Sequence, residues 1–206
     1  MAAEAGISQP YYSRIERGRE PGVALETLVA CASALNVQLA AFVEALPGAS
    51  LPRDIEHLRR QSLVVELVAR GGWQAIPEFA LPGDGPRPRS IDVLIARPAR
   101  REAAVIEIWD LLLDGGDAIR GLEAKVAATR DRLGDGWNIQ GLLVLRRTKR
   151  NLGLIGDVAP LFAARYPASS ASWIRALVDP TSPMPAGAGF AWSSVTGERL
   201  IAARLR

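Results

Sequence analysis

Residues Gly6–Gly22 read GISQPYYSRIERGREPG, and they carry the most specific structural signal in the chain. Ser8 is a good N-cap, because its hydroxyl can accept a hydrogen bond from a free amide at the start of a helix. Tyr12 and Ile15 then fall three residues apart on one helical face, and Gly18 supplies a C-terminal stop. The pattern predicts a short helix that begins after Ser8 and exposes its polar and basic side chains.

A short apolar segment precedes this helix. Ala2, Ala3, Ala5 and Ile7 predict another short helix, which turns at Gly6. Two short helices joined by a tight turn that contains glycine form a helix-turn-helix unit. The second helix carries amide, hydroxyl and guanidinium groups, which are the groups needed to contact base edges in a major groove.

The segment Ala2–Leu46 resembles the Xre (lambda-repressor-like) helix-turn-helix family. The resemblance is carried by the Ser-Gln opening of the recognition helix, its Ser-Arg-Ile-Glu-Arg-Gly close and the Leu-Glu-Thr-Leu segment that follows. It implies binding to double-stranded DNA, with a homodimer on paired half-sites. By position it places Gln9, Pro10 and Arg14 against bases with Tyr11 beside them, and Ser8 and Arg17 at phosphates. The same predicted surface includes Ser13 and Arg19.

The segment departs from that family at its start. Members of that family normally have a further helix before the one that begins here at Ala2. In this chain Met1 already lies at the start of the Ala2 helix. Without it, the apolar faces of Leu25–Leu46 lose part of their cover, so we expect a longer reading frame upstream. The alternative interpretation of residues 1–46 is a small helical domain whose arginines form a solvated face.

The composition limits the class of protein. With 206 residues and 49% hydrophobic content, the chain is long enough for one or two packed domains. Its net charge of +3 is compatible with nucleic acid, and it contains no membrane-spanning run. The single cysteine, Cys31, lies on an apolar helical pattern, which indicates a buried thiol in a reducing compartment. The only histidine is His57, which excludes His-rich zinc sites. We therefore expect a soluble cytoplasmic protein without a membrane partner.

The rest of the chain predicts two further helices, a linker and a larger α/β domain. The helices span residues 23–37 and 38–46, and the Pro/Gly/Ser-rich linker spans residues 47–53. Residues 54–206 predict a helix at 54–70, strands at 73–81, 90–96 and 103–112, a helix at 117–133 and a strand at 137–146. The tail predicts a helix near 157–166, an apolar segment at 172–178 and a last helix at 197–206.

Three acidic residues lie inside the predicted strands, namely Glu78, Asp92 and Glu107. Carboxylates in apolar strands are costly to bury unless they are paired or bind a cation, and on adjacent strands they offer the hard ligands that Mg²⁺ prefers. The order of elements, with Asp92 followed by Glu107, resembles the restriction-endonuclease-like PD-(D/E)XK superfamily over residues 54–147. The resemblance implies metal ligation by Asp92 and Glu107, and Glu66 matches an acidic position often seen on the first helix.

The third strand departs from the pattern of that superfamily. The pattern requires Glu-x-Lys, with both side chains on one face of the strand, but the triplet here is Glu107-Ile108-Trp109. Tryptophan can neither activate water nor neutralise a developing negative charge. Lys125, on the following helix, is the candidate for the missing ammonium group.

Three functions remain open from the sequence. The leading interpretation is a sequence-specific DNA-binding regulator whose nuclease-like domain is inactive, with Lys125 on the surface and the carboxylates paired with Arg89 or Arg120. The second is a Mg²⁺-dependent DNA endonuclease that uses Glu78, Asp92, Glu107 and Lys125. The third is a ligand sensor whose second domain controls DNA binding, which an apolar pocket would favour.

Overall fold

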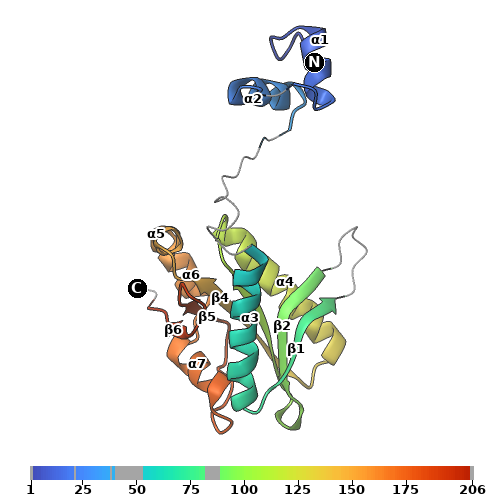
Figure 1. The fold of residues 1–206 in the computed structure, drawn as a ribbon. Coiled ribbons are helices and arrows are strands. Elements are labelled where there is room, and N and C mark those ends of the chain that lie inside the picture. The colour runs from blue at the N-terminus through green and yellow to red at the C-terminus, as the bar shows by residue number, and fades with distance from the viewer. Residues whose placement is uncertain (1, 21, 38, 40–52, 82–88, 205–206) are drawn as a thin grey trace. The chain divides into compact units, whose positions relative to one another are not determined.

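The computed structural model describes residues 2–20, 22–37, 39, 53–81 and 89–204 (Figure 1). The chain divides into two compact units, Met1–Ser50 and Leu51–Arg206. The predicted helix at 38–46 lies outside the described residues, apart from Leu39, which is not helical. The predicted linker at 47–53 also lies outside them, apart from Arg53, which begins a helix.

The first unit contains two helices, α1 (Gln9–Glu16) and α2 (Leu25–Ala34). Ser8 caps α1 as predicted, because its hydroxyl accepts a hydrogen bond from the amide of Tyr11 at 3.4 Å. Gly18 follows α1 with φ +62°, a left-handed conformation that glycine adopts without strain. The sequence therefore predicted this helix and both of its ends.

The predicted short helix before Gly6 is instead a turn. Two hydrogen bonds close it, from the amide of Gly6 to Ala3 O at 3.2 Å and from the amide of Ile7 to Ala2 O at 3.0 Å. Gly6 has φ +69°, which ends any helical conformation after a single turn. One turn is too short to recover the cost of helix nucleation, so these residues stop at a turn.

A small apolar cluster holds the first unit together. Tyr12 of α1 and Cys31 of α2 are buried against Ala2 and Ala5, which confirms the predicted burial of the cysteine. Several other apolar side chains of this unit are exposed, among them Leu25, Val29, Leu35 and Val37.

The second unit is a six-stranded sheet with helices on both faces. Its strands are β1 (Gln74–Leu81), β2 (Arg89–Arg97), β3 (Glu102–Trp109), β4 (Asn138–Arg146), β5 (Gly189–Ser193) and β6 (Leu200–Ala202). They lie in the order β1-β2-β3-β4-β5-β6, in which β3, β4 and β5 run parallel and the other pairs are antiparallel. The helices are α3 (Arg53–Arg70), η1 (Pro98–Arg100), α4 (Gly115–Leu133), α5 (Lys149–Asp157), α6 (Ala159–Arg165) and α7 (Ser170–Val178).

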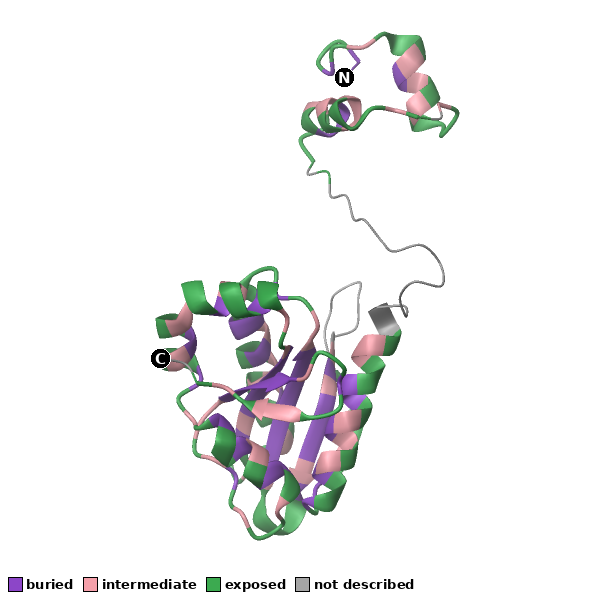
Figure 2. Ribbon diagram, turned by 60° about the vertical axis from the view of Figure 1, so that its left-hand side comes forward, coloured by how far each residue is buried: buried purple, intermediate pink, exposed green. Residues whose placement is uncertain are grey.

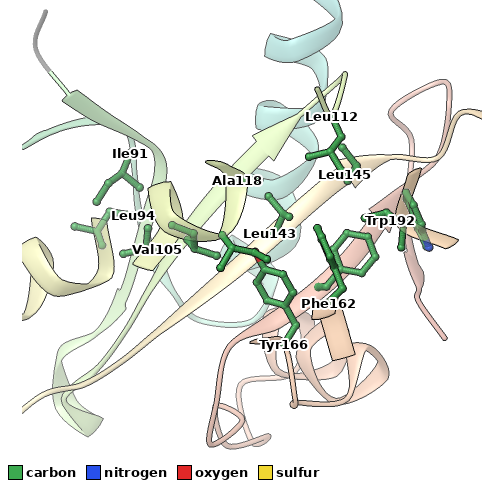
Figure 3. Close-up of a cluster of buried hydrophobic side chains, with 14 of the residues drawn as sticks. Ile91, Leu94, Val105, Leu112, Ala118, Leu143, Leu145, Phe162, Tyr166 and Trp192 are labelled. Carbon is green, nitrogen blue, oxygen red and sulfur yellow. The ribbon is translucent and has the colours of Figure 1, made fainter. Parts of the chain in front are cut away.

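Two hydrophobic cores lie on opposite faces of this sheet (Figure 2). Helices α3 and α7 cover one face, and α4, α5 and α6 cover the other. Strand β4 contributes to both cores, since Leu143 and Leu145 face α4 and α6 while Leu142 and Val144 face α3 and α7. Figure 3 shows the core around Leu143 and Phe162. Strand β4 is therefore buried on both faces.

Two buried guanidinium groups fix α3 on the sheet. Arg60 is 0% exposed, forms an ion pair with Asp110 at 2.6 Å and donates to the carbonyl oxygen of Val195 at 2.7 Å. Arg97 is 6% exposed and donates to the carbonyl oxygen of Gly71, directly after α3, at 2.6 Å. Because buried charges are stable only when they are paired and hydrogen-bonded, these contacts restrict where both ends of α3 can lie.

The predicted order of helix, three strands, helix and strand is present in residues 53–146, but the details after Trp109 differ. Strand β3 ends at Trp109 rather than at residue 112. The predicted helix near 157–166 corresponds to α6, which follows a separate helix, α5. The two helices meet at Val158, because Pro160 cannot donate a helical hydrogen bond. The predicted last helix at 197–206 is wrong: its described part contains β6, which pairs with the edge of β5.

We expect Gly189→Ala to destabilise the second unit by roughly 1–3 kcal/mol, because overpacking forces a filled core to move. A Cβ atom at Gly189 would lie 2.1 Å from Cδ1 of Trp173, whose side chain is fully buried. Gly153→Ala in α5 is the control, since nothing lies within 4 Å of its added methyl group. Urea unfolding followed by tryptophan fluorescence reports on this unit, because all five tryptophans belong to it. Equal stability of the two variants would contradict the prediction.

Candidate functional site

The first candidate surface is the exposed face of α1. Gln9 and Pro10 begin this helix and are exposed, as are Arg14, Arg17 and Arg19, whereas Tyr11 and Ser13 are half-buried. Ser8 is also exposed, although its hydroxyl is already used as the N-cap. All eight residues of the predicted DNA surface therefore lie in α1, in its N-cap or in the turn after it.

Arg14 is held in place by two neighbours. Its Nε lies 2.6 Å from Oε2 of Glu20, and its guanidinium stands 5.6 Å from the centre of the Tyr11 ring. Sequence reasoning missed Glu20, which reaches back from the turn after α1. The Glu20 carboxylate therefore competes with a base or a phosphate for the Arg14 guanidinium.

The second candidate site lies on β1, β2 and β3, which each contribute one carboxylate. Glu78, Asp92 and Glu107 lie on these adjacent strands, as predicted from the sequence. The backbone is irregular there, because Glu78 has φ +49°, a conformation that side chains other than glycine seldom adopt. Strained residues of this kind gather at functional sites.

Asp92 and Glu107 contact each other through the backbone. The amide of Asp92 lies 3.4 Å from Oε1 of Glu107, and Oδ2 of Asp92 accepts a hydrogen bond from the amide of Ile108 at 2.6 Å. The regular ladder between β2 and β3 ends at Val93 and Ile106, one residue before this pair. Where the ladder ends, side-chain oxygens of Asp92 and Glu107 therefore accept hydrogen bonds from backbone amides.

Lys125 completes a carboxylate–lysine cluster with these three acids. Its Nζ lies 2.5 Å from Oε2 of Glu107, and its side chain is 19% exposed. The alternative in which Lys125 is an ordinary surface lysine does not fit this contact. Nor does Arg120 pair with the site, because it pairs with Asp117 on its own helix, and the side chain of Arg89 lies outside the described residues.

The cluster shifts the pKa values of two of its members. Burial raises the pKa of Asp92 above its ordinary value. Burial, and then the charge of Asp92, raise the pKa of Glu107 to about 7, although Lys125 opposes the shift. Two carboxyl groups that are buried side by side resist carrying two negative charges, and a cation placed between them would remove that penalty.

Sequence reasoning missed two residues of α3 that face the cluster. Nε2 of His57 lies 3.8 Å from Oδ1 of Asp92, and Nε2 of Gln61 donates to Oε1 of Glu78 at 2.8 Å. The ligand atoms of His57, Glu78 and Asp92 all lie within 4.8 Å of one another, which is close enough for one metal ion. The signal was the spacing of His57 and Gln61, four residues apart on one helical face.

Glu66, the acidic residue expected on the first helix of the nuclease-like unit, does not join the cluster. It is exposed on α3, five residues after Gln61 and therefore on a different helical face. Glu107 is also arranged differently from the prediction, since its carboxylate faces Lys125 while Asp92 groups with His57 and Glu78.

Comparison with known proteins bears on the first unit. Residues 1–42 match a family described as helix-turn-helix, which corresponds to the Xre-like resemblance of the sequence. Comparisons with curated proteins and with solved structures gave no match. The N-terminal unit carries a helix-turn-helix. Among the described residues, no helix is long and apolar enough to cross a membrane.

We expect Glu107→Gln to change how stability depends on pH. Because the pKa of Glu107 is raised from 4.5 to about 7, the folded protein keeps a proton that the unfolded chain has already released. Stability from this proton is complete below the unfolded pKa and is lost as the pH rises through the folded one. Wild type should therefore lose stability relative to the variant between about pH 5 and 8, measured by urea unfolding with chelator present. A difference that does not vary with pH would contradict this expectation.

Proposed function

We propose that this protein binds double-stranded DNA in a sequence-specific way through α1 and acts as a transcriptional regulator. The helix-turn-helix match at residues 1–42 carries this proposal. The exposed residue types support it, because an amide, a hydroxyl and guanidinium groups lie along one short helix and the turn after it. The class of the bound DNA is a duplex with paired half-sites, contacted by a homodimer.

The residues of α1 divide into two roles. Glutamine is suited to pairing with adenine and arginine to pairing with guanine, so we assign these base contacts to Gln9 and Arg14. We assign to Pro10 an apolar contact with a thymine methyl group. Arg17 and Arg19 are exposed at the end of the helix, where they are available to phosphates. Base contacts supply specificity and phosphate contacts supply salt-dependent affinity.

Arg14→Ala is expected to weaken binding to a selected duplex by roughly 5- to 100-fold, which is the range for loss of one bidentate base contact. Glu20→Gln is expected to tighten binding, because it releases Arg14 and removes a negative charge next to the DNA surface. The control is Glu26→Gln, which removes an exposed carboxylate from α2 without releasing an arginine. Fluorescence anisotropy on a duplex selected from a random pool measures all three. Equal tightening by both glutamine variants would show that Glu20 does not restrain Arg14.

A second function, metal-dependent cleavage of DNA, is favoured by one observation. The contact between Lys125 and Glu107 supplies the ammonium group that Trp109 cannot, next to three carboxylates on adjacent strands. The donor set fits a hard cation such as Mg²⁺, because carboxylate oxygens of Glu78 and Asp92 lie within 4.8 Å of each other, with His57 beside them. A bound Mg²⁺ would activate water and offset negative charge on a phosphate.

The protein's own groups prepare the site for a phosphodiester. Lys125 is oriented by its contact with Glu107 and would offer its ammonium group to negative charge that develops on a bound phosphate. Gln61 fixes Glu78 by one hydrogen bond and donates a second to the carbonyl oxygen of Asp92 at 2.7 Å. These groups are placed before substrate arrives, which lowers the cost of ordering them during reaction.

Cleavage of supercoiled and linear DNA in Mg²⁺ is the test of this second function. Wild type is expected to cut, whereas Asp92→Asn and Lys125→Met are expected to lose at least roughly 100-fold in rate, as when one charge-stabilising group is removed from a catalytic site. Glu66→Gln, an exposed change on α3, is the control and is expected to cut like wild type. Specific binding without cleavage by wild type would reject the endonuclease and leave the regulator.

A further inference from the structure

His57, Glu78 and Asp92 form a ligand set that differs from the Asp92 and Glu107 pair expected from the sequence. Nε2 of His57 and one carboxylate oxygen from each acid all lie within 4.8 Å of one another. The three residues come from α3, β1 and β2, so tertiary packing brings them together. One imidazole nitrogen and two carboxylate oxygens are ligands of the types that hold divalent transition-metal ions.

The oxygen of Asp92 that faces His57 is free for a ligand. Oδ2 of Asp92 accepts a hydrogen bond from the amide of Ile108, whereas Oδ1 accepts none from a described residue. Nε2 of His57 lies 3.8 Å from this Oδ1, which is too long for a hydrogen bond. Two ligands of one ion lie roughly 3.0–3.4 Å apart when each bond to the ion is about 2.1 Å. A small rotation of the imidazole would therefore bring both atoms to one ion.

Glu78 is positioned by α3 and stays accessible to solvent. Gln61 lies one helical turn after His57, and its Nε2 donates to Oε1 of Glu78 at 2.8 Å and to the carbonyl oxygen of Asp92 at 2.7 Å. A hydrogen bond of this kind fixes a carboxylate and leaves it lone pairs for a metal ion. Because Glu78 is exposed, an ion can reach the ligand set from solvent.

Glu107 lies outside this ligand set, although the sequence resemblance assigned it to a metal. Its Oε2 lies 2.5 Å from Nζ of Lys125, and its Oε1 lies 3.4 Å from the amide of Asp92. The three residues that lie close enough for one ion include His57 instead. This exchange changes the preferred ion, because Mg²⁺ takes oxygen ligands whereas imidazole suits transition metals.

We propose that His57, Glu78 and Asp92 bind one divalent transition-metal ion in preference to Mg²⁺, with Mn²⁺ as the probe. Three protein ligands leave the other positions around such an ion open to water or to a phosphate oxygen. As the cofactor of a cleavage site this ion rests on the proposed second function. Its binding is measured without DNA, so the two can fail separately.

Calorimetric titration of the full chain with Mn²⁺ and Mg²⁺ measures the preference. Wild type is expected to bind one Mn²⁺ at least about tenfold more tightly than Mg²⁺. His57→Gln should weaken Mn²⁺ binding by at least about tenfold and leave Mg²⁺ binding within about threefold, since only the nitrogen ligand is lost. Glu66→Gln, which removes an exposed carboxylate from the same helix, is the control and should bind both ions like wild type. Equal affinity of wild type for the two ions, or Mn²⁺ binding that ignores His57→Gln, would overturn the proposal.

A double variant distinguishes this ligand set from the pair expected from the sequence. Glu107→Gln combined with Lys125→Met removes one negative and one positive charge, so the net charge near the ion is unchanged. The double variant is expected to bind Mn²⁺ within about threefold of wild type, whereas Asp92→Asn loses binding, because affinity follows the charge and number of the ligands. Loss of Mn²⁺ binding in the double variant at an unchanged melting temperature would place Glu107 among the ligands and overturn the proposal.

Nitrogen ligation can be observed in the wild-type protein. His57 is the only histidine, so the chain labelled with ¹⁵N-histidine and free of a histidine tag gives the nuclear magnetic resonance signals of one imidazole. Zn²⁺ is diamagnetic and accepts imidazole ligands, so it should shift the Nε2 signal in a saturable way. An Nε2 signal that does not respond to Zn²⁺ would overturn the proposal.

The DNA cleavage assay separates this proposal from the second function. Selective Mn²⁺ binding without cleavage by wild type would support the metal site and reject the endonuclease. Cleavage in Mg²⁺ without selective Mn²⁺ binding would support the endonuclease and overturn the metal site.

Discussion

The buried guanidinium of Arg60 is the contact on which the arrangement of the second unit depends. It is fully shielded from water, and its charge is balanced by Asp110 after β3 and by hydrogen bonds to Glu56, Ser193 and Val195. The carboxylates of Glu56 and Asp110 both pair with it, and removing both would leave a buried charge uncompensated, which costs on the order of 3–5 kcal/mol. The position of α3 over the sheet is therefore tightly specified, and with it the positions of the side chains one turn away on either side.

The carboxylate–lysine cluster places unfavourable buried charge on the sheet, and the packing of α3 and α4 on the sheet holds it there. Glu107 is buried in an apolar strand beside Asp92, which raises the pKa values of both carboxyl groups. Lys125 relieves part of this penalty from α4, while His57 approaches Asp92 from α3 on the other face of the sheet. A fold selected for stability alone would replace such a group by apolar residues, because buried ion pairs seldom repay their desolvation. The proposed cleavage of DNA would use this cluster, because a bound cation would offset the unfavourable charge of its carboxylates.

Much of the architecture could be predicted from local patterns. The helix Gln9–Glu16 follows from its serine cap and terminal glycine, and strands β1 to β4 follow from their apolar runs between turn residues. The predictions failed where tertiary contacts overrode the local sequence pattern. Leu200–Ala202 forms a strand because β5 offers an unpaired edge, which a helical pattern in the sequence does not reveal. Of the two predicted arginine partners, Arg120 does not pair with the carboxylates because it pairs with Asp117 on its own helix.

The sequence by itself determined the helix Gln9–Glu16 and the order of elements through β4, and it offered Glu78, Asp92, Glu107 and Lys125 as candidate site residues. These follow from residue type and spacing, which act over one helical turn or one strand. Only the tertiary structure decided that Lys125 reaches Glu107 and that His57 and Gln61 face the acids. Those facts depend on how helices far apart in the chain pack on the two faces of one sheet, and packing is fixed by shape and burial rather than by local sequence.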